Sequence, residues 1–216
     1  MTRVLCVAPH PDDESVGCGG TLRRHVVEGD EVRVVFLTSG ERGGHGRSPE
    51  ETACVREAEA TAAARILGAQ GTEFWREPDG ALRVHRRLVA RLRELLSSWK
   101  PGTVYVSHSG DGHADHRAAA RLVARAMSEL PKTRRASRPE VLQFEVWTPL
   151  TRMDRIIDVT PFIDVKIAAI RAHASQCAVL AFDDAARGLA RWRGEMFSWP
   201  EGEYAEVFSR RDGPQR

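Results

Sequence analysis

Short, continuous apolar runs recur along the chain, and each is followed by polar residues and then by a segment with helical character. The runs at 4–8, 32–37 and 104–106 are typical of strands that are buried on both faces. Leucines and a valine at helical spacing predict an amphipathic helix over residues 83–99. Strands that alternate with helices favour a mainly parallel sheet with helices on both faces, which is the α/β class.

Local signals define one helix especially well. Ser48-Pro49-Glu50-Glu51 combines an N-cap serine, a proline at the first helical position and a glutamate at the third. The helix should run to Leu67 and stop at Gly68. Further strands are predicted at 72–75, 141–147, 155–159 and 204–208, and further helices at 22–27, 113–127 and 160–173. We expect a single domain of Rossmann-like topology over residues 1–216, without an internal repeat or a linker.

Composition narrows the function classes. The formal net charge is +2, from 32 basic and 30 acidic residues, so no strongly basic surface indicates binding to nucleic acid or to an anionic membrane. No apolar stretch approaches the ~20 residues that span a bilayer, and no signal peptide opens the chain. The four cysteines form no CxxC pair. We therefore expect a cytoplasmic protein with reduced cysteines.

Polar side chains follow several of the predicted strands, at the edge where parallel sheets bind ligands. Those after the second strand include Ser39, Glu41 and Arg42. Two richer groups follow the first and fourth strands: His10, Asp12, Asp13 and Glu14, and His108, Asp111, His113, Asp115 and His116. Imidazole and carboxylate are good zinc ligands, and a spare carboxylate can act as a general base. The sequence therefore indicates a catalytic metal site at this edge.

Several of these residues also have ordinary structural interpretations. The acidic group after the first strand could simply cap a helix, and Glu14 is expected to support that helix. His108 could line the pocket or make a structural hydrogen bond. Gly17, Gly19 and Gly20 are expected to let the backbone pass close to the metal site.

Two motifs resemble those of a known family. Ala8-Pro9-His10-Pro11-Asp12-Asp13-Glu14, followed by Gly17-Cys18-Gly19-Gly20-Thr21, is similar to the signature of the PIG-L/LmbE-like N-deacetylases. His113-Ala114-Asp115-His116 resembles their second motif, HxDH. Weaker similarity between and after these motifs extends the resemblance over nearly the whole chain.

The resemblance implies a role for each matching position. It assigns metal binding to three residues: His10, Asp13 and His116. Asp12 would be the general base, and His113 would stabilise the oxyanion or protonate the leaving amine. Asp115 would orient a neighbouring histidine, as carboxylates beside metal ligands do.

The resemblance also points to substrate contacts. Arg56 falls where the family carries a substrate-facing arginine, and Thr38-Ser39-Gly40-Glu41 resembles its TxGE-like turn. Arg56, Ser39 and Glu41 are accordingly predicted to contact the substrate.

Together these observations predict zinc-dependent hydrolysis of an N-acetyl or other N-acyl amide. The expected substrate is a small N-acetylglucosamine-type molecule, such as a sugar-containing natural product or a thiol precursor. Two alternatives remain open, an amidase for a bulkier thiol-conjugate amide and a non-catalytic nucleotide- or metal-binding module. The ligand set can hold iron(II) as well as zinc, and family precedent makes assembly into a homo-oligomer plausible.

Overall fold

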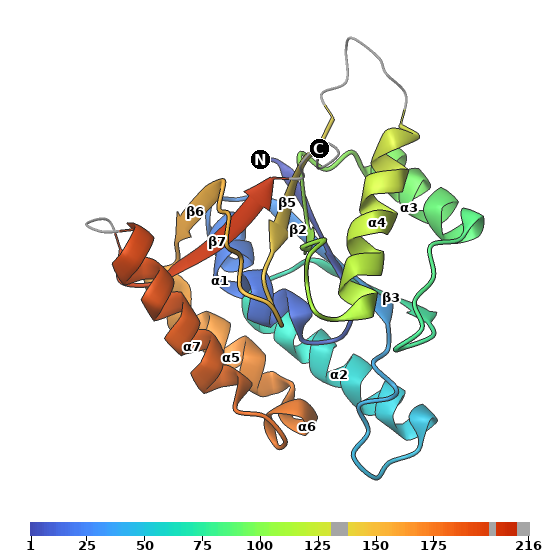
Figure 1. Ribbon diagram of the computed structural model, residues 1–216, viewed down its shortest axis with the longest axis horizontal. Coiled ribbons are helices and arrows are strands. Elements are labelled where there is room, and N and C mark those ends of the chain that lie inside the picture. The colour runs from blue at the N-terminus through green and yellow to red at the C-terminus, as the bar shows by residue number, and fades with distance from the viewer. Residues whose placement is uncertain (131–137, 199–201, 211–216) are drawn as a thin grey trace.

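A seven-stranded sheet forms the centre of the computed structural model, which describes residues 1–130, 138–198 and 202–210 (Figure 1). The strand order is β3-β2-β1-β4-β5-β7-β6. Strands β1 to β5 pair in parallel, whereas β7 pairs antiparallel with both β5 and β6. The strands are β1 (Arg3–Ala8), β2 (Glu31–Thr38), β3 (Gly71–Glu77), β4 (Thr103–Ser107), β5 (Glu140–Phe144), β6 (Arg155–Asp158) and β7 (Ala205–Arg210).

Helices cover both faces of this sheet (Figure 1). The helical elements are α1 (Asp13–Val27), α2 (Pro49–Leu67), α3 (Arg86–Trp99), α4 (Ala114–Ser128), η1 (Thr160–Phe162), α5 (Ile163–Ala172), α6 (Ala174–Cys177), α7 (Phe182–Arg193) and η2 (Gly194–Ser198). One core cluster joins α3 and α4 to the sheet, and a second joins α1, α2 and α5 to the opposite face. A smaller cluster packs α7 on α5. The predicted α/β class, with a mainly parallel sheet and helices on both faces, is confirmed.

Helix α2 forms as its sequence signals predict. Ser48 accepts a hydrogen bond from the Glu51 amide, and Glu51 accepts one from the Ser48 amide, which completes a capping box. Gly68 ends the helix in the left-handed conformation, at φ 84°.

Helix α1 is longer than its sequence suggests, and the prediction that it begins at residue 22 is wrong. It starts at Asp13, and Cys18 interrupts it at φ −147°. Its glycines serve close packing of α1, contrary to the prediction that they bring backbone to the metal site. A Cβ at Gly17 would overlap the Phe144 ring, and a Cβ at Gly20 would lie 2.7 Å from the Val159 Cβ. Tertiary packing has here outweighed the low helix propensity of glycine.

Other boundaries also differ from the predictions. The strand predicted at 141–147 ends at Phe144, and the helix predicted at 160–173 is divided into η1 and α5. The basic composition of residues 131–139 favours a surface loop, and this segment lies mostly outside the described residues. Within the described part of the chain, no helix combines the length and the apolar character that a membrane crossing requires.

The strand order explains where a site can form. Because the order reverses between β1 and β4, the loops that follow these two strands diverge and leave a crevice at the sheet edge. The first loop carries His10 to Asp13, and the second carries His108 to His113. The fold thus brings together the two His/Asp groups that are about a hundred residues apart in sequence.

Candidate metal centre

Three buried side chains place one donor atom each at the corners of a triangle. His10 follows β1, Asp13 begins α1, and His116 lies in the first turn of α4. Asp13 Oδ2 lies 3.1 Å from His10 Nδ1 and 3.2 Å from His116 Nε2, and the two nitrogens lie 3.3 Å apart. Donors bonded to one tetrahedral Zn²⁺ at their usual lengths stand about 3.4 Å apart. The predicted ligand set therefore has the spacing that a metal ion of this size requires.

In both histidines a carboxylate contacts the ring nitrogen that faces away from the triangle. His10 Nε2 lies 3.1 Å from Asp79 Oδ1 and 3.3 Å from Asp115 Oδ2. His116 Nδ1 lies 3.4 Å from Asp111 Oδ1. A carboxylate on the far nitrogen fixes the ring and makes the near nitrogen a better metal ligand. Asp115 thus contacts a histidine, and its role in orienting that ring stays a prediction. Sequence reasoning gave no role to Asp79 or Asp111.

The cluster carries more negative than positive charge. Burial opposes protonation of His116, but Asp13 and Asp111 raise its pKa to about 9. Burial likewise opposes protonation of His10, yet its carboxylate partners hold its pKa well above the ordinary value. The neighbouring imidazoles lower the pKa of the Asp13 carboxyl despite its burial. A buried group of this composition favours a bound cation.

Asp12 lies beside the triangle but faces a different partner. Its Oδ2 accepts a hydrogen bond from Arg56 Nη2 at 2.9 Å. Burial raises the pKa of Asp12 to about 6, against the opposing charge of Arg56. Adjacent side chains of an extended segment point opposite ways, which predicts that the Asp12 and Asp13 carboxylates diverge. The premise of an extended segment is wrong. Asp12 instead has φ 130° and ψ −30°, a strained backbone that turns its side chain away from that of Asp13.

His113 is fixed as the N-cap of α4. Its Nδ1 accepts a hydrogen bond from the Asp115 amide at 3.2 Å. The neutral ring must therefore carry its proton on Nε2, which makes that atom a donor. The ring lies edge-on to His10, with centroids 4.8 Å apart. Burial and the neighbouring imidazoles lower the pKa of His113, so the neutral form is favoured.

Arg56 is almost fully buried and makes several local hydrogen bonds. Its guanidinium donates to the carbonyl oxygens of Gly40 and Pro11, at 2.9 and 2.7 Å, as well as to Asp12. It also lines the cavity described below. The described structure thus ties Arg56 firmly to the loops around Asp12, and any contact with a substrate would come in addition to these bonds.

Ser39 and Glu41 hold the surrounding loops together. Ser39 Oγ donates to Glu57 Oε1 at 2.6 Å. Glu41 Oε1 accepts a hydrogen bond from the Asp79 amide at 2.8 Å. In the described structure both residues lie beside the cavity rather than among its lining residues, and Glu41 supports the backbone of an aspartate that contacts His10.

Glu14 supports the first loop from within the protein. Its carboxylate accepts a hydrogen bond from the Asp12 amide at 3.1 Å and lies 3.1 Å from His173 Nε2. Both Glu14 and His173 are buried. His108 was expected either to line the pocket or to make a structural hydrogen bond. Its ring hydrogen-bonds the Thr148 carbonyl at 2.8 Å, which favours the structural role.

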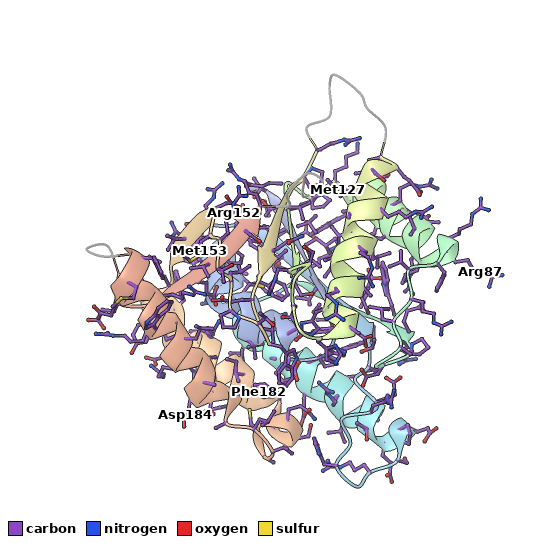
Figure 2. The ribbon with its side chains drawn as sticks, in the orientation of Figure 1. Arg87, Met127, Arg152, Met153, Phe182 and Asp184 are labelled. Atoms are coloured by element: carbon purple, nitrogen blue, oxygen red, sulfur yellow. The ribbon has the colours of Figure 1, made fainter. Side chains whose placement is uncertain are left out.

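The triangle opens into a cavity of ≈ 400 Å³. One wall is polar and includes Arg42, His45, Asp79 and His113. The other wall comes from the segment after β5 and from the α6–α7 region, and it includes Trp147, Leu180 and Phe182. Figure 2 shows Phe182 at the start of α7. The cavity thus lies between the 41–48 loop and the C-terminal part of the chain.

The fold and the site together define the class of protein. The chain is a Rossmann-like α/β protein whose sheet edge carries a buried His/Asp cluster that fits a metal site. A model of the PIG-L family, described as GlcNAc-PI de-N-acetylase, matches residues 5–127. The chain therefore belongs to the PIG-L family of metal-dependent N-deacetylases, some of whose relatives are hydratases.

Individual relatives agree with this assignment. A 1D-myo-inositol 2-acetamido-2-deoxy-alpha-D-glucopyranoside deacetylase of Mycobacterium sp. (strain KMS) is 31% identical over 84% of this chain and 76% of its own length. The structure of N,N'-diacetylchitobiose deacetylase from Pyrococcus horikoshii is similar with a TM-score of 0.85 and 26% identity, over 97% of this chain and 84% of that one. A 4-carboxy-2-hydroxymuconate hydratase from Pseudomonas putida is similar with a TM-score of 0.86 and 27% identity, over 100% and 98% of the two chains.

Proposed function

We propose that this protein hydrolyses the N-acyl amide, most simply the acetamide, of a small N-acetylglucosamine-type substrate. The observation that carries the proposal is the arrangement of three groups in one cavity: the ligand triangle, the Asp12 carboxylate and the Nε2–H of His113. His10, Asp13 and His116 would hold the metal ion, for which zinc fits best. A bound Zn²⁺ would supply Lewis-acid chemistry, which polarises an acyl carbonyl and lowers the pKa of a water molecule toward neutrality.

The side chains around the triangle supply the proton transfers. Asp12 accepts a proton from the attacking water, a role that suits a buried carboxylate whose pKa is raised. Arg56 holds the Asp12 carboxylate in place through its 2.9 Å hydrogen bond. The Nε2–H of His113 donates to the carbonyl oxygen as negative charge develops there. When the C–N bond breaks, the amine nitrogen takes the proton that Asp12 accepted from the water, and neutral His113 remains a hydrogen-bond donor.

The substrate class follows from the cavity and from the relatives. A space of ≈ 400 Å³ accommodates an amino sugar with a small appended group. Polar groups along one wall, including Asp79 and Arg42, can bind sugar hydroxyls. Two of the relatives are named for acetamido-sugar substrates, which supports this substrate class. Within it we propose an amino-sugar natural product or a thiol precursor as the natural substrate.

A hydratase is the competing function, because a hydratase relative is 33% identical over 80% of this chain. Both reactions need an activated water, so the metal triangle does not separate them. A muconate-type substrate carries several carboxylates, which require cationic partners. In this cavity the Arg56 guanidinium is already paired with Asp12, and Arg42 is the other arginine among the lining residues. One arginine for several carboxylates favours a substrate that is neutral around the reacting amide.

The test compares both reactions on one preparation. The protein is stripped with a chelator, reloaded with Zn²⁺ or Fe²⁺, and assayed for acetate release from N-acetylglucosamine and diacetylchitobiose. Water addition to 4-carboxy-2-hydroxymuconate is followed in parallel by the loss of absorbance of its conjugated system. Metal-dependent acetate release without hydration is expected. Hydration without acetate release would overturn the proposal.

A further inference from the structure

An apolar groove lies beside the metal-site cavity. It has a volume of ≈ 430 Å³ and is formed by the segment after β5, by the start of α1 and by one side of α7. Its lining residues are Val16, Val146, Trp147, Leu180, Ala181, Phe182, Ala185, Ala186 and Leu189. Five of these also line the metal-site cavity: Val16, Val146, Trp147, Leu180 and Phe182. The groove is therefore a continuation of the metal-site cavity along α7.

The shared wall leaves large apolar side chains in contact with water. Trp147 is 52% exposed and Leu180 is 45% exposed. The rings of Trp147 and Phe182 meet edge to face, with centroids 6.0 Å apart, at the junction of the two spaces. A contiguous apolar surface of this kind in a concave site is characteristic of ligand binding.

The lining also indicates which chemical group the groove would accept. Its side chains are aliphatic or aromatic, and only the Trp147 indole N–H can form a hydrogen bond. Sugar hydroxyls would lose their hydrogen bonds to water here without replacement, which is unfavourable. An alkyl or aryl group would instead gain from leaving water. The polar wall and the apolar groove thus suit the two halves of an amphipathic substrate.

We infer that the groove binds an alkyl or aryl group attached to the amino-sugar substrate, so that the preferred substrate is an amphipathic N-acylglucosamine derivative. This inference rests on the proposed amide hydrolysis and specifies its substrate. The apolar group can belong either to the aglycone or to the acyl chain, because both start at the sugar ring that the metal-site cavity holds. In either position the same lining residues contact it.

The test measures kcat/KM for three substrates with the metal-loaded enzyme: N-acetylglucosamine, its octyl glycoside and N-octanoylglucosamine. One of the two octyl compounds should exceed N-acetylglucosamine by at least about tenfold, and which of them does so identifies the end that occupies the groove. Equal values for all three substrates would overturn the inference while leaving amide hydrolysis intact.

A charge placed in the groove provides the matched test. Ala185 is exposed, lines the groove and lies in the first turn of α7, where a glutamate is compatible with the helix. Ala185→Glu should lower the ratio of the octyl to the plain substrate at least about tenfold. Ala58→Glu makes the same change at an exposed position of α2 outside both spaces and should keep the ratio. A ratio that survives Ala185→Glu would contradict the inference.

Binding separates this inference from the proposed function. Octyl 2-amino-2-deoxyglucoside, the deacetylated form of the octyl glycoside, is titrated into the protein, and binding is followed by Trp fluorescence. Light scattering measures the molar mass of the protein. Tighter binding than glucosamine, weakened by Ala185→Glu, supports the groove even if no amide is hydrolysed. Binding equal to that of glucosamine refutes it. A dimer whose interface contains the groove would also refute it. Light scattering would then show dimers for the wild type and for Ala58→Glu, and monomers for Ala185→Glu.

Discussion

A buried ion pair repairs the break in α1, and its removal should be costly. In an unbroken helix the Gly20 amide would donate to the Val16 carbonyl, but the irregular backbone at Cys18 separates them. Lys166 Nζ donates to the Val16 carbonyl at 2.7 Å, and Glu206 accepts from the Gly20 amide at 2.9 Å. Lys166 and Glu206 contact each other at 2.5 Å, with exposures of 2% and 4%. The pair therefore satisfies both broken ends of the helix.

Lys166→Met keeps the length of the side chain but removes its charge and its donors. Breaking a buried pair from one side costs about 3–5 kcal/mol of unfolding free energy, because Glu206 keeps its backbone hydrogen bonds but loses its cation. With ordinary urea dependence the unfolding midpoint should fall by about 1–2 M. Urea titration followed by circular dichroism measures this change at constant slope.

Two further variants make the prediction strict. Arg24→Met breaks an exposed pair in the same helix, whose partners are 43% and 51% exposed, and should cost only about 0.5 kcal/mol. Lys166→Met combined with Glu206→Gln should be less destabilised than Lys166→Met alone, since no charge is then left unpaired. A loss in Lys166→Met no larger than that in Arg24→Met would show that the buried pair does not stabilise the interrupted helix.

Three other perturbations have defined outcomes. Asp111→Asn should weaken Zn²⁺ binding about 10–100-fold, measured by competition with a chromophoric chelator, with circular dichroism unchanged. Gly17→Ala should destabilise by at least about 2 kcal/mol in thermal unfolding, because its Cβ would overlap the Phe144 ring, whereas Gly29→Ala meets no neighbour and bears only the strain of φ 89°. Burial raises the pKa of Asp30, but hydrogen bonds from the Thr2 amide and from His25 lower it overall. Because its pKa is lower in the folded than in the unfolded chain, this carboxylate stabilises the fold above about pH 4. That stabilisation is lost as the pH falls through the lowered pKa of Asp30. Asp30→Asn should therefore reduce the loss of unfolding free energy on acidification, measured by urea titrations at several pH values. A pH profile equal to that of the wild type would contradict this prediction.

The parts of the fold that local sequence signals encode were predictable. The apolar runs gave the parallel strands, and the capping box with its glycine stop gave α2 at both ends. Helix α1 was predicted too short because glycines disfavour a helix in the local sequence. The packing that requires them, against Phe144 and Val159, involves residues far away in sequence. The antiparallel pairing of β7 with β5 and β6 likewise depends on long-range contacts that no local pattern expresses.

The candidate site was predictable to a similar degree. Their places after predicted strands singled out the two His/Asp groups, and the resemblance of two motifs to a known family then assigned the three proposed ligands and Asp12 among them. Asp79 was missed, although it comes directly after β3, and applying the strand-end rule to that strand would have found it. The bonds of Arg56 to Gly40 and Pro11 could not be inferred, since they depend on how two loops approach each other.

The proposed roles are tested most directly by Asp12→Asn. This change keeps the shape of the side chain and its hydrogen bond to Arg56 but removes the proposed base. Asp184→Asn, on the outer side of α7 (Figure 2), is the matched control. Both variants and the wild type are loaded with Zn²⁺, their metal content is determined, and acetate release from N-acetylglucosamine derivatives is measured.

We expect one metal ion per chain in all three proteins and a loss of kcat in Asp12→Asn of about 10²–10⁴-fold, with Asp184→Asn unchanged. Acetate release by Asp12→Asn within a few-fold of the wild type, at equal metal content, would contradict the role of Asp12 as the general base.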